Sequence, residues 1–308
     1  MRPAVLGALA ICISATLWGL DGVALTPRLH NLDVLQVVFL LHAVPFALMH
    51  LFLVPSYRAL GGLTAPRWLD LGLVALAGGV VGTYSIVRAL FLVEFNQLSV
   101  VVLLQKLQPV FALLLAAVLL EEKLSPRLLV RTATALLGAY LLTFGASLPD
   151  FASGSNTTRA AAWALLAAGS YGAATVLGKR LLGSLDFKQA TFGRYGATVI
   201  LTFVALMATR GELALDRVTS SNWMVIAIIG ATTGSGALFL YYFGLSRVRA
   251  GIAAICEMCL PLSAILFDYW INDSWLSAWQ WVGAAILVGA ITLVTLQPSP
   301  RTESPATA

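Results

Sequence analysis

The chain has 308 residues, of which 59% are hydrophobic and 11% charged, and its formal net charge is +5. A soluble domain carries about 25% charged residues, and a chain of this size cannot hide so much apolar surface in a folded interior. The composition therefore excludes a soluble enzyme, a disordered chain and a nucleic-acid-binding protein. It indicates an all-α protein whose solvent is the lipid bilayer.

A helix needs about 20 mostly apolar residues to cross a bilayer. Ten such runs follow one another at 4–25, 32–54, 68–92, 97–120, 127–145, 160–178, 188–209, 222–245, 250–271 and 276–296. The first run is too long, and its flank too poor in basic residues, for a cleaved signal peptide. The sequence predicts a polytopic membrane protein of ten transmembrane helices, with a disordered cytoplasmic tail at 298–308.

The basic residues predict the orientation of the chain, because cytoplasmic loops are enriched in Lys and Arg. With the N-terminus in the cytoplasm, twelve basic residues face the cytoplasm: Arg2, Arg58, Arg67, Lys123, Arg127, Arg131, Lys179, Arg180, Lys188, Arg247, Arg249 and Arg301. Four face the outside: Arg28, Arg159, Arg210 and Arg217. This bias predicts a multi-pass protein of the cell (inner) membrane with both termini in the cytoplasm.

The two halves of the chain share several features at nearly one spacing. Leu32-Asp33-x-x-Gln36-x-x-Phe39 recurs as Leu185-Asp186-x-x-Gln189-x-x-Phe192, 153 positions later. The pairs Gly78/Gly82 and Gly230/Gly234, and Pro109 and Pro261, are 152 positions apart. The predicted units are 1–148 and 149–297, each with five helices. Because five is odd, the two copies must be inverted relative to each other, as in many secondary transporters.

The motifs also carry a resemblance to a known family. Trp18-Gly19, Pro109 and Glu121-Glu122, with the stretch LSVVVLLQKLQPVFALLLAAVLLEEKL at 98–124, resemble the EamA-type branch of the drug/metabolite transporter superfamily. The second half keeps Pro261 but has Asp273-Ser274 where an acidic pair would repeat. The resemblance implies a ten-helix carrier of a bacterial or archaeal membrane, most often an exporter of small metabolites. Its members move amino acids, vitamins, nucleobases and toxic amphiphiles, so it names no substrate.

Two charged residues are predicted near the bilayer midplane. Lys106 lies roughly 13 Å along the fourth helix and Glu257 roughly 11 Å along the ninth, at a rise of 1.5 Å per residue. A charge at this depth costs about 2.5–3.5 kcal/mol on insertion scales, so such residues mark cavities or ion pairs. We expect both to flank one central substrate cavity; the alternative is a permanent ion pair between the two helices. Gln105 is the repeat counterpart of Glu257 and either joins the cavity or forms an interhelical hydrogen bond.

Further candidates for substrate binding lie on other helices. Arg194 and Tyr195 stand on the seventh helix, where Arg194 either faces the cavity or extends to the membrane surface. Trp18 and its repeat counterpart Tyr171 each precede a glycine well inside a span. They would form an aromatic wall or pack between helices.

Asp21 and Arg88 lie near the outer ends of the first and third helices, as an outer gate or a static salt bridge. Pro109 and Pro261 each remove a backbone hydrogen bond and should kink their helices.

The sequence predicts no catalytic residue, no cofactor and no metal site. We expect a secondary active transporter, a monomer or a homodimer, that works by alternating access in the lipid bilayer. Lys106 and Glu257 across one cavity would suit an amino-acid-like zwitterion or another small amphiphile, moved outward, and Glu257 is a candidate for a coupling proton. The alternatives are import of a small metabolite or vitamin by the same fold, a membrane-embedded enzyme acting on a lipid-linked substrate, and a scaffold or sensor that transports nothing.

Overall fold

The structure is a computed structural model that describes residues 2–94, 98–148, 155–273 and 275–296. Every element in these ranges is helical. Within them, nine helices are long and apolar enough to span a membrane, and a tenth, shorter apolar helix covers Leu103–Leu119. The described part of the chain thus forms ten spans, as expected for a polytopic membrane protein. The tail predicted to be disordered, 298–308, lies outside the described residues.

The first five spans are assembled from whole and interrupted helices. In order they are α1 (Pro3–Leu20) with the turns η1 (Asp21–Leu25) and η2 (Thr26–Leu29); α2 (Val34–Leu53); α4 (Ala65–Val74), η3 (Ala75–Gly82) and α5 (Thr83–Leu92); α6 (Leu98–Gln105) and α7 (Gln108–Leu119); and α8 (Pro126–Phe144). The short helix α3 (Ser56–Gly61) joins the second span to the third.

The second five spans follow the same plan. They are α9 (Ser155–Leu181); α10 (Phe187–Thr209); α11 (Ser220–Ile229), η5 (Gly230–Gly234) and α12 (Ser235–Leu245), preceded by the short turn η4 (Leu215–Arg217); α13 (Ala250–Cys256) and α14 (Cys259–Asn272); and α15 (Ala278–Thr295). In both halves the third span contains a π-helical segment at the paired glycines, η3 or η5. In both halves the fourth span is broken. The inverted repeat of five helices therefore extends to local backbone geometry.

The two breaks have a chemical cause. Proline has no backbone N–H, and its ring clashes with the carbonyl group four residues earlier, which for Pro109 and Pro261 belongs to Gln105 and Glu257. The α-helical pattern stops at these points: α6 ends at Gln105 and α13 at Cys256. The kinks predicted from the prolines are confirmed as breaks. Lys106 and Glu257 each stand in the gap between two half-helices.

The repeated Leu-Asp-x-x-Gln motif is a helix start. The carboxylate of Asp33 accepts a hydrogen bond from the backbone N–H of Leu35 at 3.0 Å, and that of Asp186 accepts two at 2.8 Å each at the start of α10. Side-chain oxygens at this position satisfy backbone donors that have no partner within the helix. The motif thus sets where two equivalent spans begin.

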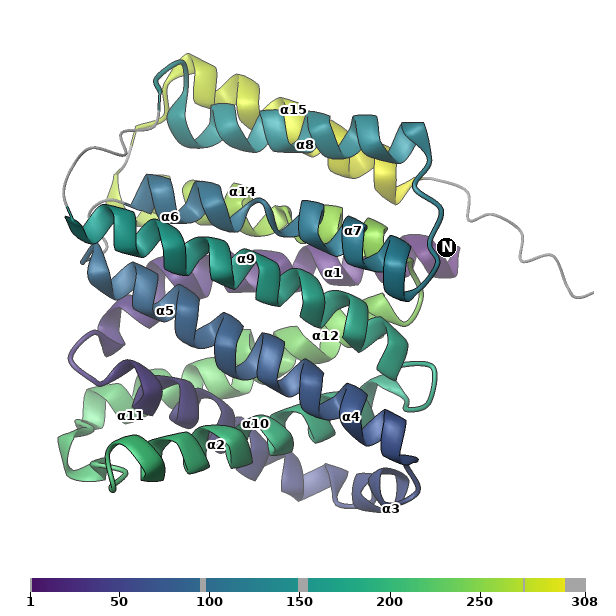
Figure 1. Cartoon of the computed structure of the whole chain (residues 1–308). Coiled ribbons are helices and arrows are strands. Elements are labelled where there is room, and N and C mark those ends of the chain that lie inside the picture. Colours follow the sequence, from purple (N-terminus) through teal and green to yellow (C-terminus); the bar gives the residue numbers. More distant parts are fainter. Residues whose placement is uncertain (1, 95–97, 149–154, 274, 297–308) are drawn as a thin grey trace, which may run out of the picture.

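The fifth and tenth spans form an outer pair, α8 with α15, beside the other eight spans (Figure 1). Their backbones approach closely at Gly138 and Gly283: a β-carbon on Gly138 would lie 2.7 Å from the backbone nitrogen of Leu287. Small residues permit this kind of contact between helices in lipid.

The end of the bundle where α1 begins and α15 ends is called here the terminal end (Figure 1). Ion pairs join neighbouring helices there. The buried carboxylate of Asp70 pairs with Arg67 and Arg180, both at 3.1 Å, and joins α4 to α9. The carboxylate of Glu122 pairs with Arg249 at 3.4 Å and accepts a hydrogen bond from the backbone N–H of Ala250 at 2.9 Å. Around these pairs lies a packed apolar cluster that includes Ile11, Leu181, Tyr242 and Leu245.

Candidate functional site

A cavity of about 290 Å³ lies between the two repeats. Its lining comes from the first four spans and from the sixth to the ninth; among the described residues, none from α8 or α15 takes part. Pockets for small molecules measure about 300–1,000 Å³, so this volume suits a compact ligand. The wall reaches Thr26 and Leu90, away from the terminal end.

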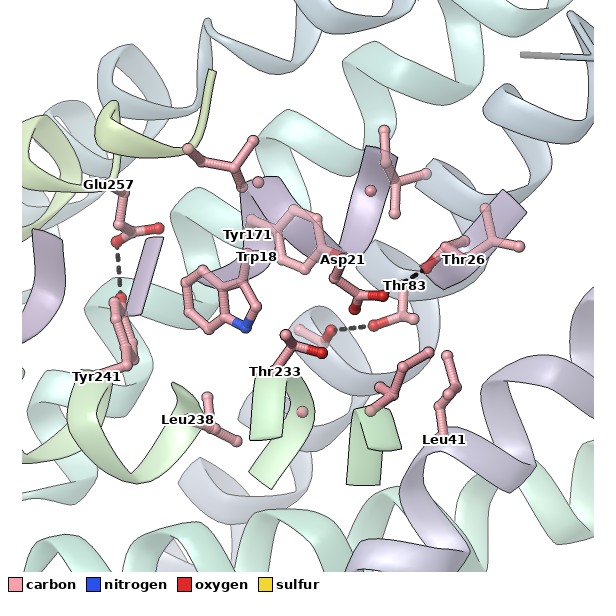
Figure 2. A pocket seen from close by; sticks show the side chains of 18 of the residues that line it. Trp18, Asp21, Thr26, Leu41, Thr83, Tyr171, Thr233, Leu238, Tyr241 and Glu257 are labelled. Atoms are coloured by element: carbon pink, nitrogen blue, oxygen red, sulfur yellow. Dashed lines mark hydrogen bonds between the residues drawn. The ribbon is translucent and has the colours of Figure 1, made fainter. Parts of the chain in front are cut away.

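Glu257 marks one end of the cavity. Its Oε1 accepts a hydrogen bond from the hydroxyl group of Tyr241 at 2.8 Å (Figure 2). The same oxygen accepts one from the hydroxyl group of Thr175 at 3.1 Å, and Oε2 accepts one from the side-chain amide of Gln108. All three of these donors are neutral. The helix break before α14 is what places this carboxylate at the cavity wall.

Asp21 lies in a second polar group, on the other side of Trp18 (Figure 2). Its carboxylate accepts a hydrogen bond from the hydroxyl group of Thr26 at 3.0 Å, and Thr83 and Thr233 line the same part of the wall. The hydroxyl group of Thr83 donates to the carbonyl oxygen of Gly78 at 3.0 Å, within the π-helical segment η3. One carboxylate and three hydroxyl groups are suited to bind a hydroxylated chain.

Aromatic side chains separate the two polar groups. The ring of Trp18 lies against that of Tyr241, with centroids 5.4 Å apart, and Tyr171 lies close by in the wall (Figure 2). His42 and Tyr195 form a second ring contact in the wall, at 5.3 Å. Such faces stack on flat rings and on cations.

Arg194 is the single Lys or Arg among the described residues that line this cavity, and 8% of its surface is exposed. Its Nη1 donates to the hydroxyl group of Tyr242 at 3.4 Å, whereas its Nε has no hydrogen-bond partner in the described structure. No ion pair involving Arg194 is found among the described residues. The side chain therefore stays at the cavity and does not extend to the membrane surface.

Seven of the nine candidate residues meet in this cavity: Trp18, Asp21, Gln105, Tyr171, Arg194, Tyr195 and Glu257. Lys106 and Arg88 do not line it.

The structure places Lys106 beside the cavity and not in its wall. Its Nζ donates to the carbonyl oxygen of Ala139 at 3.2 Å and to the hydroxyl group of Thr143, so the side chain turns toward α8. Lys106 and Glu257 both line a small recess of about 30 Å³ between the two helix breaks, which shares Gln105, Gln108, Glu257 and Leu260 with the cavity wall, and they form no ion pair. Lys106 is one residue beyond Gln105, which lines the cavity. Because one residue turns a helix by about 100°, the side chain of Lys106 points away from the cavity and toward α8.

The expected pairing of Asp21 with Arg88 is also not found in the described part of the chain. Asp21 is held by Thr26 instead. Arg88 is half-buried on α5, outside the cavity wall. Their role as a gate stays a prediction.

Sequence reasoning did not single out His42, Thr175, Tyr241 or the threonines at positions 26, 83 and 233. A polar side chain within an apolar span is itself a signal for a cavity, and that signal would have found His42. The threonines gave no such signal, because Thr is also common in contacts between helices. Thr191, Thr198 and Thr202 lie outside the cavity wall, and each donates to a carbonyl group of its own helix.

Comparison with known proteins agrees with this architecture. The model of the EamA-like transporter family matches residues 5–144 and 158–296. The chain is 47% identical, over 290 residues, to the riboflavin transporter ImpX of Fusobacterium nucleatum subsp. nucleatum, covering 94% of this chain and 97% of the relative. A solved crystal structure with 19% identity superposes with a TM-score of 0.69 over 96% of this chain and 98% of the other, which supports the fold alone. The chain thus belongs to the EamA-like transporter family, as a multi-pass membrane transporter and not an enzyme.

Proposed function

We propose that this transporter takes up riboflavin or a closely related flavin across the cell membrane, by alternating access around the cavity between the repeats. The observation that carries the proposal is the 47% identity to a riboflavin transporter along nearly the whole chain, together with a cavity whose wall suits a flavin. A flavin combines a flat heteroaromatic ring with a hydroxylated chain. Trp18, Tyr171 and Tyr241 would stack on the ring, and Asp21 with its threonine neighbours would bind the hydroxyl groups.

This proposal replaces the expectation of an amino-acid-like substrate moved outward. That expectation rested on Lys106 and Glu257 facing each other across one cavity, and Lys106 turns toward α8. The cavity wall extends away from the terminal end, where ion pairs join neighbouring helices. With the termini in the cytoplasm, as the basic residues predict, the cavity is placed to load from outside.

The direct test is flavin flux into proteoliposomes that contain the purified protein. We expect saturable uptake of radiolabelled riboflavin, competed by unlabelled riboflavin and unaffected by an excess of mixed amino acids. Absence of both flux and flavin binding in a protein that remains monodisperse would contradict the proposal. So would amino-acid flux without riboflavin flux.

We further propose that Glu257 carries a coupling proton. Its carboxylate faces the cavity with three neutral hydrogen-bond donors and no basic partner among the described residues. Carboxyl groups of this kind carry protons in many pumps and transporters. In the same proteoliposomes, an inward proton gradient should accelerate net uptake, and a protonophore should remove the acceleration.

A further inference from the structure

Arg194 lines the cavity, and not all of its hydrogen-bond donors have a partner among the described residues. A guanidinium group has five N–H donors and no acceptor, and a buried charge without a partner is costly. The Nη1 of Arg194 reaches the hydroxyl group of Tyr242 at the long distance of 3.4 Å, and its Nε has no partner in the described structure. Only 8% of the surface of Arg194 is exposed, so bulk water cannot freely hydrate its charge. Because Arg194 lines the cavity, a ligand bound there is the nearest available partner for the donors that remain unused.

The fold holds this guanidinium group in one place. A β-carbon on Gly78 would lie 2.5 Å from its Nη2 and 3.0 Å from its Cζ, so the absence of a side chain at Gly78 makes the room. On another side the ring of Tyr242 lies 5.8 Å from Cζ. Arg194 therefore reaches from α10 to the π-helical segment η3 and to α12. A rigid, planar fork of donors in a fixed position suits a planar partner with two adjacent acceptors.

We propose, on the basis of the function proposed above, that Arg194 recognises the flavin ring by two parallel hydrogen bonds to one edge. A flavin has two such edges, each with a ring nitrogen next to a carbonyl oxygen: N5 with the C4 carbonyl group, and N1 with the C2 carbonyl group. Arginine reads the equivalent pair, N7 and O6 of guanine, in the same bidentate way. Arg194 is thus a specificity-determining residue of the substrate site.

A phosphate group is the other partner that an arginine fork suits, and the charges of the wall argue against it. Asp21 and Glu257 line the same cavity, and Arg194 is the single Lys or Arg there among the described residues. A dianionic phosphate would enter beside two carboxyl groups with one compensating cation, and like charges in a poorly hydrated site repel strongly. A neutral ring edge avoids this cost.

The test is a binding experiment on the purified full-length protein with four flavins. Riboflavin, 5-deazariboflavin, 1-deazariboflavin and riboflavin 5′-phosphate are titrated against wild type, Arg194→Met and Arg194→Lys by isothermal calorimetry. The deaza analogues replace one ring-nitrogen acceptor with a C–H group and keep the rest of the molecule. Wild type should bind one of the two analogues about tenfold more weakly than riboflavin, the scale of a charge-assisted hydrogen bond.

In Arg194→Met, riboflavin should bind about tenfold more weakly than in wild type, and the analogue should lose its disadvantage because the donor is gone. Arg194→Lys keeps the charge but not the fork, so it should resemble Arg194→Met. The matched control is Arg131→Met on α8, because Arg131 also has an unpartnered nitrogen, Nη1, but lies outside the cavity wall. It should bind all four flavins as wild type does.

A second pair of variants serves if Arg194→Met does not fold. Gly78→Ala should displace the guanidinium group and reproduce the loss of discrimination, whereas Gly72→Ala, with nothing within 4 Å of the added carbon, should not. Equal affinity of wild type for riboflavin and both analogues would overturn the inference, as would unchanged discrimination in Arg194→Met. Tighter, Arg194-dependent binding of the phosphorylated flavin would overturn it in favour of phosphate recognition. Failure of wild type to bind any flavin would instead overturn the proposed function.

Discussion

Lys106 and Glu257 each stand in the gap between two half-helices of related spans, but at positions that differ by one residue in the repeat. Glu257 faces the cavity and accepts three hydrogen bonds there, whereas Lys106 faces α8. The difference is one residue of register. The counterpart of Glu257 at the repeat spacing is Gln105, which lines the cavity, and the counterpart of Lys106 is Met258, which is packed in the apolar cluster beside α8 and α15.

This comparison shows what an internal repeat determines. It determines the backbone: both spans break, and both present the residue at 105 or 257 to the cavity. It does not determine chemistry, since a lysine occupies the position that a methionine fills in the other half. Lys106 thus contacts the outer pair, whereas Glu257 lines the cavity.

The largest effect is expected from Glu257→Gln, which removes the proton-carrying group and keeps the shape. Gradient-driven riboflavin uptake should fall to the level without a gradient, while exchange of labelled for unlabelled riboflavin continues. Both are measured in one batch of proteoliposomes. Loss of both activities would show that Glu257 binds substrate directly, and retention of gradient-driven uptake would exclude it as the coupling site.

The outer pair should respond in stability and not in binding. Gly283→Ala places a methyl group against the backbone of Gly138 and Leu142, and overpacking of this kind costs about 1–3 kcal/mol. The midpoint of thermal unfolding in detergent should fall while the riboflavin affinity of the folded fraction stays the same. Gly289→Ala, on the same helix with nothing within 4 Å, should change neither. Equal midpoints for the two variants would mean that the close contact of α8 and α15 is wrong.

A smaller effect is expected from Tyr241→Phe, which removes one donor to Glu257 and keeps the ring beside Trp18. The lost hydrogen bond joins two groups of the protein, so its removal should lower the free energy of unfolding by about 1 kcal/mol. Thermal unfolding in detergent measures this change, and calorimetric titration should find the riboflavin affinity close to that of wild type, because the ring stays in place. Tyr84→Phe is the control, because Tyr84 packs against Trp163 outside the cavity wall and should change neither quantity.

The smallest effect is expected from Lys106→Met, which copies the residue at the equivalent position, Met258. Riboflavin affinity should stay within about twofold of wild type, and stability should not decrease, because replacing a buried charge with an apolar side chain of similar size is often neutral or stabilising. Titration and thermal unfolding measure the two. A loss of affinity as large as that of an Arg194 variant would return Lys106 to the substrate site.

The fold was predictable because its largest signals are long: ten apolar runs, and a repeat carried by helix starts, paired glycines and prolines. The site was predictable where a polar or charged residue stands in an apolar span, as with Asp21, Arg194 and Glu257. The direction of the Lys106 side chain was not predictable. One residue of register decides it, and hydropathy does not resolve single residues. The group of threonines around Asp21 was also not predictable, because its members come from three different spans and meet only in the folded bundle.

The π-helical segments η3 and η5 have a mechanical consequence. A π turn holds more residues than an α turn, and an α-helix turns by about 100° per residue. If either segment tightened to α geometry, the half-helix beyond it would rotate about its own axis. It would then present another of its faces to the cavity. Thr83, Ile86 and Leu90 follow η3, and Leu238 and Tyr241 follow η5. Tightening of η3 or η5 would therefore change which side chains face the cavity.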